Sequence, residues 1–201
     1  MIRILAALVF MATAASAQIY PEVYSVTDVA ASDRLNVRAA PDAGSEILGS
    51  YPPYAINIEV LQTSPDGAWG MVGWGERNGW VALRYLVATP PADPYALPRP
   101  LVCSGVEPFW SLGIYPRGDE YTDMDDGRRD LTLTEEAVAI NGYAAHFVEG
   151  PTLERTLLVK RGQCSDTMSD RIYGWQAMLF SAAPDGNTLV SGCCTLDANT
   201  P

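Results

Sequence analysis

Short segments of alternating apolar and polar residues run through the first third of the chain, without the spacing of an amphipathic helix. The alternating or apolar segments there are residues 35–38, 56–60, 69–72 and 79–83. A period of two is typical of strands that bury one face. Turn-forming tetrads at 41–44 and 64–67, each with proline and glycine, lie between them. Residues 19–88 are therefore predicted to form a small β-barrel.

The C-terminal half has the same kind of pattern in longer segments. Its predicted strands are residues 109–114, 131–134, 137–140, 157–160, 175–180 and 188–190. Residues 184–187 read Pro-Asp-Gly-Asn and predict a hairpin turn between the last two strands. The fold class predicted for the whole chain is all-β, a small barrel followed by a second antiparallel β-barrel or sandwich.

A proline-rich segment separates the two halves. Residues 89–100 contain five prolines, which disfavour both a helix and a sheet ladder. The segment is expected to be a linker between a domain at 19–88 and a domain at 101–201.

The first residues have the pattern of a secretory signal peptide. Arg3 precedes an apolar run at 4–11, and residues 15–17 read Ala-Ser-Ala, a typical cleavage site. The apolar run is too short to cross a bilayer core of about 30 Å. We expect residues 1–17 to be removed, no membrane anchor to remain, and the mature protein to be periplasmic or secreted.

Charge and composition exclude several functions. The chain has 13 basic and 24 acidic side chains and a net charge of −11, which argues against nucleic-acid binding. Its one histidine, His146, disfavours a multi-histidine metal site, and no nucleophile with a base can be identified. The acidic residues 119–130 do not fit the spacing of a calcium loop and are expected to form a solvated loop. We expect neither a cofactor nor an enzyme.

Four cysteines are expected to form two disulfides in an exported chain. Cys103, Cys164, Cys193 and Cys194 all lie in the second half. Because Cys193 and Cys194 are adjacent, a bridge between them would be strained, so each is expected to bond either Cys103 or Cys164.

The first domain resembles the bacterial SH3-like (SH3b) domain. The resemblance rests on residues 35–41, 47–49, 79–81 and 85–86, together with Trp69, and it covers most of residues 23–88. It implies a binding module rather than a catalyst. The expected function is that of an envelope protein that recognises peptidoglycan or wall peptides.

Aromatic side chains of this domain are the candidate ligand contacts, since rings stack on sugars and pack against peptides. The candidates are Tyr51, Tyr54, Trp69, Trp74 and Tyr85. Trp80, beside Val81 on a predicted strand, is instead assigned to the core. Because the domain is acidic, salt is expected to leave binding to an anionic wall polymer unchanged or to strengthen it slightly.

The second domain resembles a family of exported bacterial proteins that has no assigned activity. The resemblance rests on residues 105–110, 164–173 and 192–193. It implies a β fold, an envelope location, and the disulfide pairs Cys164–Cys193 and Cys103–Cys194.

Polar residues in these motifs are given structural roles. Asp166, Asp170 and Arg171 are expected to order the loop after Cys164, and Glu107 is expected to form a buried pair with Arg171. The alternative function is a periplasmic inhibitor or accessory protein that acts on a partner enzyme through the second domain.

Overall fold

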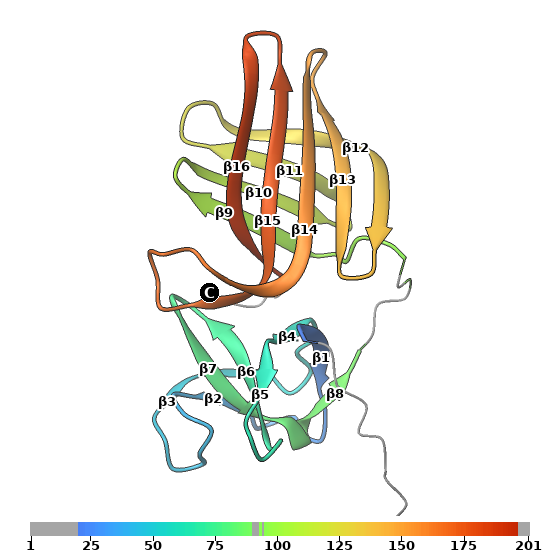
Figure 1. Ribbon diagram of the computed structural model, residues 1–201. Helices are drawn as coiled ribbons and strands as arrows, with labels where there is room; N and C mark the ends of the chain where they lie inside the picture. The colour runs from blue at the N-terminus through green and yellow to red at the C-terminus, as the bar shows by residue number, and fades with distance from the viewer. Residues whose placement is uncertain (1–19, 90–92, 94, 197–201) are drawn as a thin grey trace, which may run out of the picture.

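A computed structural model describes residues 20–89, 93 and 95–196 (Figure 1). Its regular structure consists almost entirely of strands, and the only helical element among these residues is the short 3₁₀ turn η1 (Leu83–Tyr85). The predicted all-β fold is confirmed. The expected signal segment, residues 1–17, lies outside the described residues.

No helix in the described part of the chain is long and apolar enough to cross a membrane.

Eight short strands form an N-terminal unit of two antiparallel sheets. They are β1 (Glu22–Val26), β2 (Leu35–Arg38), β3 (Ile47–Tyr51), β4 (Ile58–Val60), β5 (Gln62–Thr63), β6 (Trp69–Trp74), β7 (Arg77–Ala82) and β8 (Leu86–Ala88). One sheet has the order β4-β1-β8 and the other the order β3-β2-β7-β6-β5. Both contribute to one apolar core, in which Val37, Ile58, Val60, Val72 and Val81 are completely buried.

Eight longer strands form the C-terminal unit. They are β9 (Leu101–Val106), β10 (Phe109–Tyr115), β11 (Gly118–Asp123), β12 (Gly127–Ala139), β13 (Gly142–Glu149), β14 (Leu153–Ser165), β15 (Ile172–Ala183) and β16 (Gly186–Thr195). Each strand pairs antiparallel with the next one, and β16 pairs with β9, which closes a barrel. Of the two architectures predicted for this half, the barrel is the one present.

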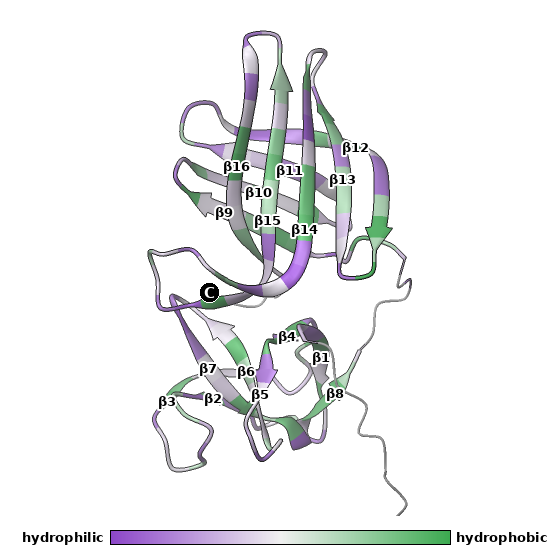
Figure 2. Ribbon diagram, in the orientation of Figure 1, coloured by the Kyte–Doolittle hydropathy of each residue, from purple (hydrophilic) through white to green (hydrophobic). Residues whose placement is uncertain are grey.

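Alternation along these strands fills the barrel with side chains. Leu112, Phe147, Leu157, Leu179 and Trp175 come from four of the strands and are completely buried in one core. Along β14 and β15 the side chains alternate between the interior and the outer surface, and the outward ones include the hydrophobic residues Leu158, Met178 and Phe180; Figure 2 shows the hydropathy along these strands. The barrel is thus packed internally, as expected for eight strands.

Two glycines let Trp110 enter the seam between β9 and β16. The indole Nε1 of Trp110 donates a hydrogen bond to the carbonyl oxygen of Ser191 at 3.3 Å, and its side chain is nearly buried. A Cβ atom on Gly105 would collide with the indole, and one on Gly192 would collide with the backbone of Ser104. The motif at residues 105–110 therefore has a packing role.

Buried and partly buried hydrogen bonds join the two units. Glu59 on β4 is 2% exposed, and its carboxylate accepts bonds from Trp175 Nε1 at 2.9 Å and Thr195 Oγ1 at 2.6 Å. The Asn78 side chain bonds both the N–H of Ile172, at 2.7 Å, and its carbonyl oxygen, at 3.0 Å. In Figure 1 the segment between β14 and β15 accordingly lies against β6 and β7. These contacts fix how the units meet.

The second part of the proline-rich segment packs on the barrel. Strand β8 ends at Ala88 and β9 begins at Leu101. Leu97 is buried in the barrel core, and Arg99 forms an ion pair with Glu136 at 2.6 Å. Residues 90–92 and 94 lie outside the described residues.

Two local predictions are wrong. Trp80 lies between the buried residues Gly79 and Val81 on β7, so it points away from the core and is only partly buried. The acidic residues 119–130 form a hairpin of β11 and β12 rather than a loop, because their cross-strand pairing continues from Asp119 to Asp123. Within it, Asp119 is buried and accepts a hydrogen bond from the N–H of Tyr115.

Candidate functional site

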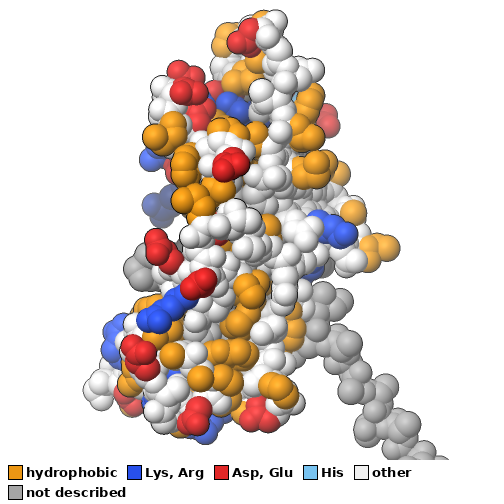
Figure 3. Space-filling view, turned by 60° about the vertical axis from the view of Figure 1, so that its left-hand side comes forward, with side chains coloured by type: hydrophobic (Ala, Val, Ile, Leu, Met, Phe, Trp, Pro, Cys, Tyr) orange, Lys and Arg blue, Asp and Glu red, His pale blue; other side chains and the backbone are white. Residues whose placement is uncertain are grey.

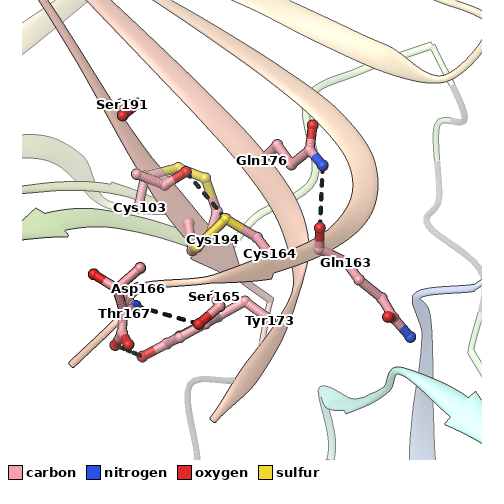
Figure 4. The surroundings of a disulfide bond; sticks show 12 residues. Cys103, Gln163, Cys164, Ser165, Asp166, Thr167, Tyr173, Gln176, Ser191 and Cys194 are labelled. Carbon is pink, nitrogen blue, oxygen red and sulfur yellow. Dashed lines mark hydrogen bonds between the residues drawn. A yellow bond between two sulfur atoms is a disulfide. The ribbon is translucent and has the colours of Figure 1, made fainter. Parts of the chain in front are cut away.

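Both disulfides lie in the barrel. Cys103 is bonded to Cys194 and Cys164 to Cys193, which is the pairing that the family resemblance implied. Cys103 and Cys194 are directly opposite each other on β9 and β16, so their bond supports the closing seam. Cys164 lies where β14 ends, and its bond ties this region to β16 (Figure 4).

Asp166 orders the loop that follows Cys164. Its carboxylate accepts bonds from the N–H groups of Met168 and Ser169. It also accepts a bond from the hydroxyl of Tyr173 at 3.2 Å (Figure 4). Burial opposes ionisation here, but these hydrogen bonds outweigh it and lower the pKa of Asp166. Asp170, in the same loop, is exposed. The loop is thus held by its own hydrogen bonds.

The predicted pair of Glu107 and Arg171 is not formed. Glu107 is exposed in the turn between β9 and β10, so its carboxylate needs no buried partner. Arg171 is buried, and it donates a bond to the carbonyl oxygen of Gly75 at 3.3 Å while its guanidinium covers the Tyr173 ring. A Cβ atom on Gly73 would collide with this guanidinium. The N-terminal unit, rather than Glu107, supplies the partner of Arg171.

A groove of about 400 Å³ crosses the N-terminal unit and contains two of the five candidate aromatic residues. We call it the aromatic groove, and its polar and aromatic lining residues are Trp69, Tyr85, Arg34, Arg38, Arg84, Asp28, Asp33 and Asn36. Trp69 and Tyr85 are each partly exposed, which leaves ring surface accessible to a ligand.

Local turns position these two rings. Ser64 starts the turn before β6, and its hydroxyl accepts a bond from the Trp69 N–H at 3.0 Å. Tyr85 ends η1, and its carbonyl oxygen accepts a bond from the Thr27 N–H at 2.9 Å. The N–H of Leu83 bonds the carbonyl oxygen of Ala68 at 3.0 Å, which holds the two segments together.

Three arginines give the aromatic groove a local positive charge in an acidic protein. Arg34 donates to Ser50 Oγ at 2.7 Å, Arg38 donates to the Ser45 carbonyl oxygen at 2.7 Å, and Arg84 lies over the Tyr85 ring. Within the described residues, none of the three forms an ion pair with a carboxylate. Only Asp28 and Asp33 offset them in the lining, so the groove can attract an anion.

The other three candidate aromatic residues lie outside this groove. Tyr51 is completely buried, so its prediction as a ligand contact is wrong: it fills the core and meets Trp74 edge to face, with ring centroids 5.3 Å apart. The Trp74 indole also packs over Gly49, where a Cβ atom would not fit. Tyr54 is 75% exposed in the segment between β3 and β4.

Sequence reasoning missed the arginines of the aromatic groove. Arg34, Arg38 and Arg84 come from three different segments, and the domain as a whole is acidic, so no local pattern indicated a basic site. The only usable signal was the position of Arg84 directly before Tyr85, itself a candidate.

The described residues offer no metal site: no group of three or more His, Cys, Asp or Glu side chains among them could hold an ion. His146 lies on β13, and its Nδ1 is 3.0 Å from Thr156 Oγ1.

No family model matches the chain, and no curated protein or solved structure proved significantly similar to it.

Proposed function

We propose that this chain is an exported binding protein whose aromatic groove recognises carboxylate-bearing peptides of the bacterial cell wall, in peptidoglycan or released from it. The observation that supports this most is the set of three arginines beside Trp69 and Tyr85, none of which has an ion-pair partner in the part of the chain that the structure describes. A guanidinium group binds a carboxylate with paired hydrogen bonds, and a ring packs on the apolar part of a peptide stem.

Charge favours a carboxylate ligand over a neutral sugar. The chain carries a net charge of −11, yet the charged residues lining the aromatic groove are three arginines and two aspartates. An arginine without a carboxylate partner in an acidic protein is best satisfied by an anion from outside. Peptide stems of the wall carry free carboxylates, whereas a glycan alone uses mainly rings and hydrogen bonds.

An extracytoplasmic location is part of the proposal. Two disulfides are compatible with an oxidising compartment, and the segment at 1–17 has the pattern of a signal peptide. A periplasmic or secreted protein would have direct access to the cell wall.

The test measures binding of purified, soluble muropeptides to the full chain by isothermal titration calorimetry. Trp69→Ala is expected to weaken binding by about 1–3 kcal/mol, because a stacked ring is lost. Arg84→Gln is expected to weaken binding of muropeptides with free carboxylates but not of the amidated forms. Arg77→Gln is the matched control, since Arg77 is exposed at the start of β7 and outside the groove.

The dependence of muropeptide binding on salt concentration provides a second test. The local arginines reverse the expectation drawn from the whole domain, so binding should now weaken as salt rises. An equal loss of muropeptide affinity in Arg84→Gln and Arg77→Gln would contradict the proposal. So would a folded Trp69→Ala variant that binds like the wild type.

A further inference from the structure

A second groove lies on the barrel, apart from the aromatic groove of the N-terminal unit. The turns at 107–108, 124–126 and 184–185 all contribute residues to its lining. The groove is open and has a volume of about 1310 Å³. We call it the mouth groove, and the residues that matter for the argument are Phe109, Met124, Leu189, Glu107, Asp125 and Asp185.

A satisfied polar network forms the base of the mouth groove. Arg155 is buried, and it donates to Glu149 at 2.6 Å and to Ser181 Oγ at 2.7 Å, while its guanidinium covers the Tyr121 ring at 3.6 Å. Burial raises the pKa of Tyr121, so its hydroxyl stays neutral. This network separates the groove from the apolar core of the barrel. A ligand is therefore held at the mouth and does not enter the interior.

The mouth groove is negatively charged. Asp123 and Asp126 in its lining both pair with Arg129. Glu107, Asp125 and Asp185 also line it, and none of these three forms an ion pair within the described residues. Arg155 is the single basic residue in the lining, and it is already paired with Glu149. The groove thus presents unpaired negative charge to a ligand.

Large apolar side chains are exposed at the same place. Phe109 is 50% exposed, Met124 80% and Leu189 59%. Figure 3 shows hydrophobic and acidic side chains intermingled over the barrel part of this face. Exposed large apolar residues with charged neighbours are typical of a surface that contacts another protein.

We infer that the mouth groove docks a basic segment of a partner protein, with lysine or arginine side chains set among apolar ones. The acidic residues of the groove complement the basic side chains of the partner. Phe109, Met124 and Leu189 contact the partner's apolar side chains. A small amphipathic amine fits less well, because small-molecule sites enclose most of their ligand, whereas this groove is wide and open.

The test uses the full chain and a short fluorescent peptide in which lysine and leucine alternate, with binding followed by anisotropy at low salt. The double variant Asp125→Asn/Asp185→Asn is expected to bind about three- to tenfold more weakly than the wild type. The double variant Glu46→Gln/Glu76→Gln is the matched control, since it removes the same charge from exposed positions in the N-terminal unit. It should bind like the wild type.

The apolar half of the groove is tested separately with Met124→Ser/Leu189→Ser, two exposed positions where the fold should tolerate serine. This variant should also bind about three- to tenfold more weakly. The inference is overturned if the lysine peptide does not bind, if a glutamate peptide binds equally well, or if both aspartate and control variants lose the same affinity. The inference is also overturned if dodecylamine binds and loses affinity in the same variants while the peptide does not bind.

Discussion

The buried carboxylate of Glu59 should contribute strongly to the stability of the whole chain, and Glu59→Leu tests this. Glu59 lies in the N-terminal unit, but Trp175 and Thr195, which donate hydrogen bonds to it, belong to the barrel. Leucine keeps a side chain of similar size and removes both acceptor oxygens. The indole N–H of Trp175 is then left without this acceptor in a completely buried position.

The size of the effect follows from the burial of each donor. A typical hydrogen bond contributes about 0.5–1.5 kcal/mol net, and a buried donor left unpaired costs about 1–3 kcal/mol. Trp175 has no access to water, so it should bear this full cost, whereas Thr195 is partly exposed and can bond water instead. We therefore expect Glu59→Leu to lower the free energy of unfolding by about 3 kcal/mol. Glu59→Gln keeps one acceptor oxygen and should cost about 1 kcal/mol.

Urea unfolding at neutral pH, followed by tryptophan fluorescence and far-UV circular dichroism, measures the loss of stability in Glu59→Leu and in Glu59→Gln. A double-mutant cycle with Trp175→Phe isolates the bond to the indole, and we expect a coupling energy of about 1–3 kcal/mol. Glu76→Leu places the same substitution at an exposed glutamate and should change stability by less than about 0.5 kcal/mol.

Two results would refute this reasoning. One is a cost for Glu59→Leu that does not exceed the cost for Glu76→Leu. The other is a coupling energy near zero between Glu59 and Trp175, which would mean that the hydrogen bond adds nothing to the contact between the two units.

Three further predictions concern the barrel. Gly105→Ala should destabilise it by about 1–3 kcal/mol in thermal or urea unfolding, because the added methyl group would overlap the Trp110 indole. Asp166→Asn should be destabilising at neutral pH, since the lowered pKa of Asp166 shows that the carboxylate is stabilised by folding. That contribution is fully present above the unfolded-state pKa of about 3.9 and is lost as pH falls through the lower folded-state pKa, so wild type and variant should converge in acid unfolding series. Removal of the Cys164–Cys193 bond by a double alanine variant should lower stability by about 3–4 kcal/mol, because the bond closes a loop of 29 residues; an unchanged urea midpoint would contradict this.

Local patterns in the sequence were enough to predict the class of fold. A period of two in polarity specifies strands wherever it occurs, because it follows from the alternating geometry of a single strand. The proline-rich run also indicated where regular pairing is interrupted, and β8 ends and β9 begins at its two ends. The family resemblance indicated the disulfide pairs that the barrel contains.

Which face of a strand is buried could not be predicted from local pattern alone. Trp80 and Val81 necessarily point to opposite sides of β7, but a large aromatic residue and a valine are both common core residues. Only the packing of the two sheets places Val81 inside and Trp80 outside. The same sheet packing buries Tyr51, a residue whose type alone suggested a ligand contact.

The sequence by itself determined strands, turns and the cysteines available for bonding, because each depends on residues that are neighbours in the chain. The tertiary structure decided the closure of the barrel, where Cys194 lies opposite Cys103 across a separation of 91 residues. It also decided that Arg171 contacts Gly75 rather than Glu107, and that Arg34, Arg38 and Arg84 share one groove with Trp69. The physical reason is that partners of this kind come from distant segments, and their identity depends on how complete sheets pack together.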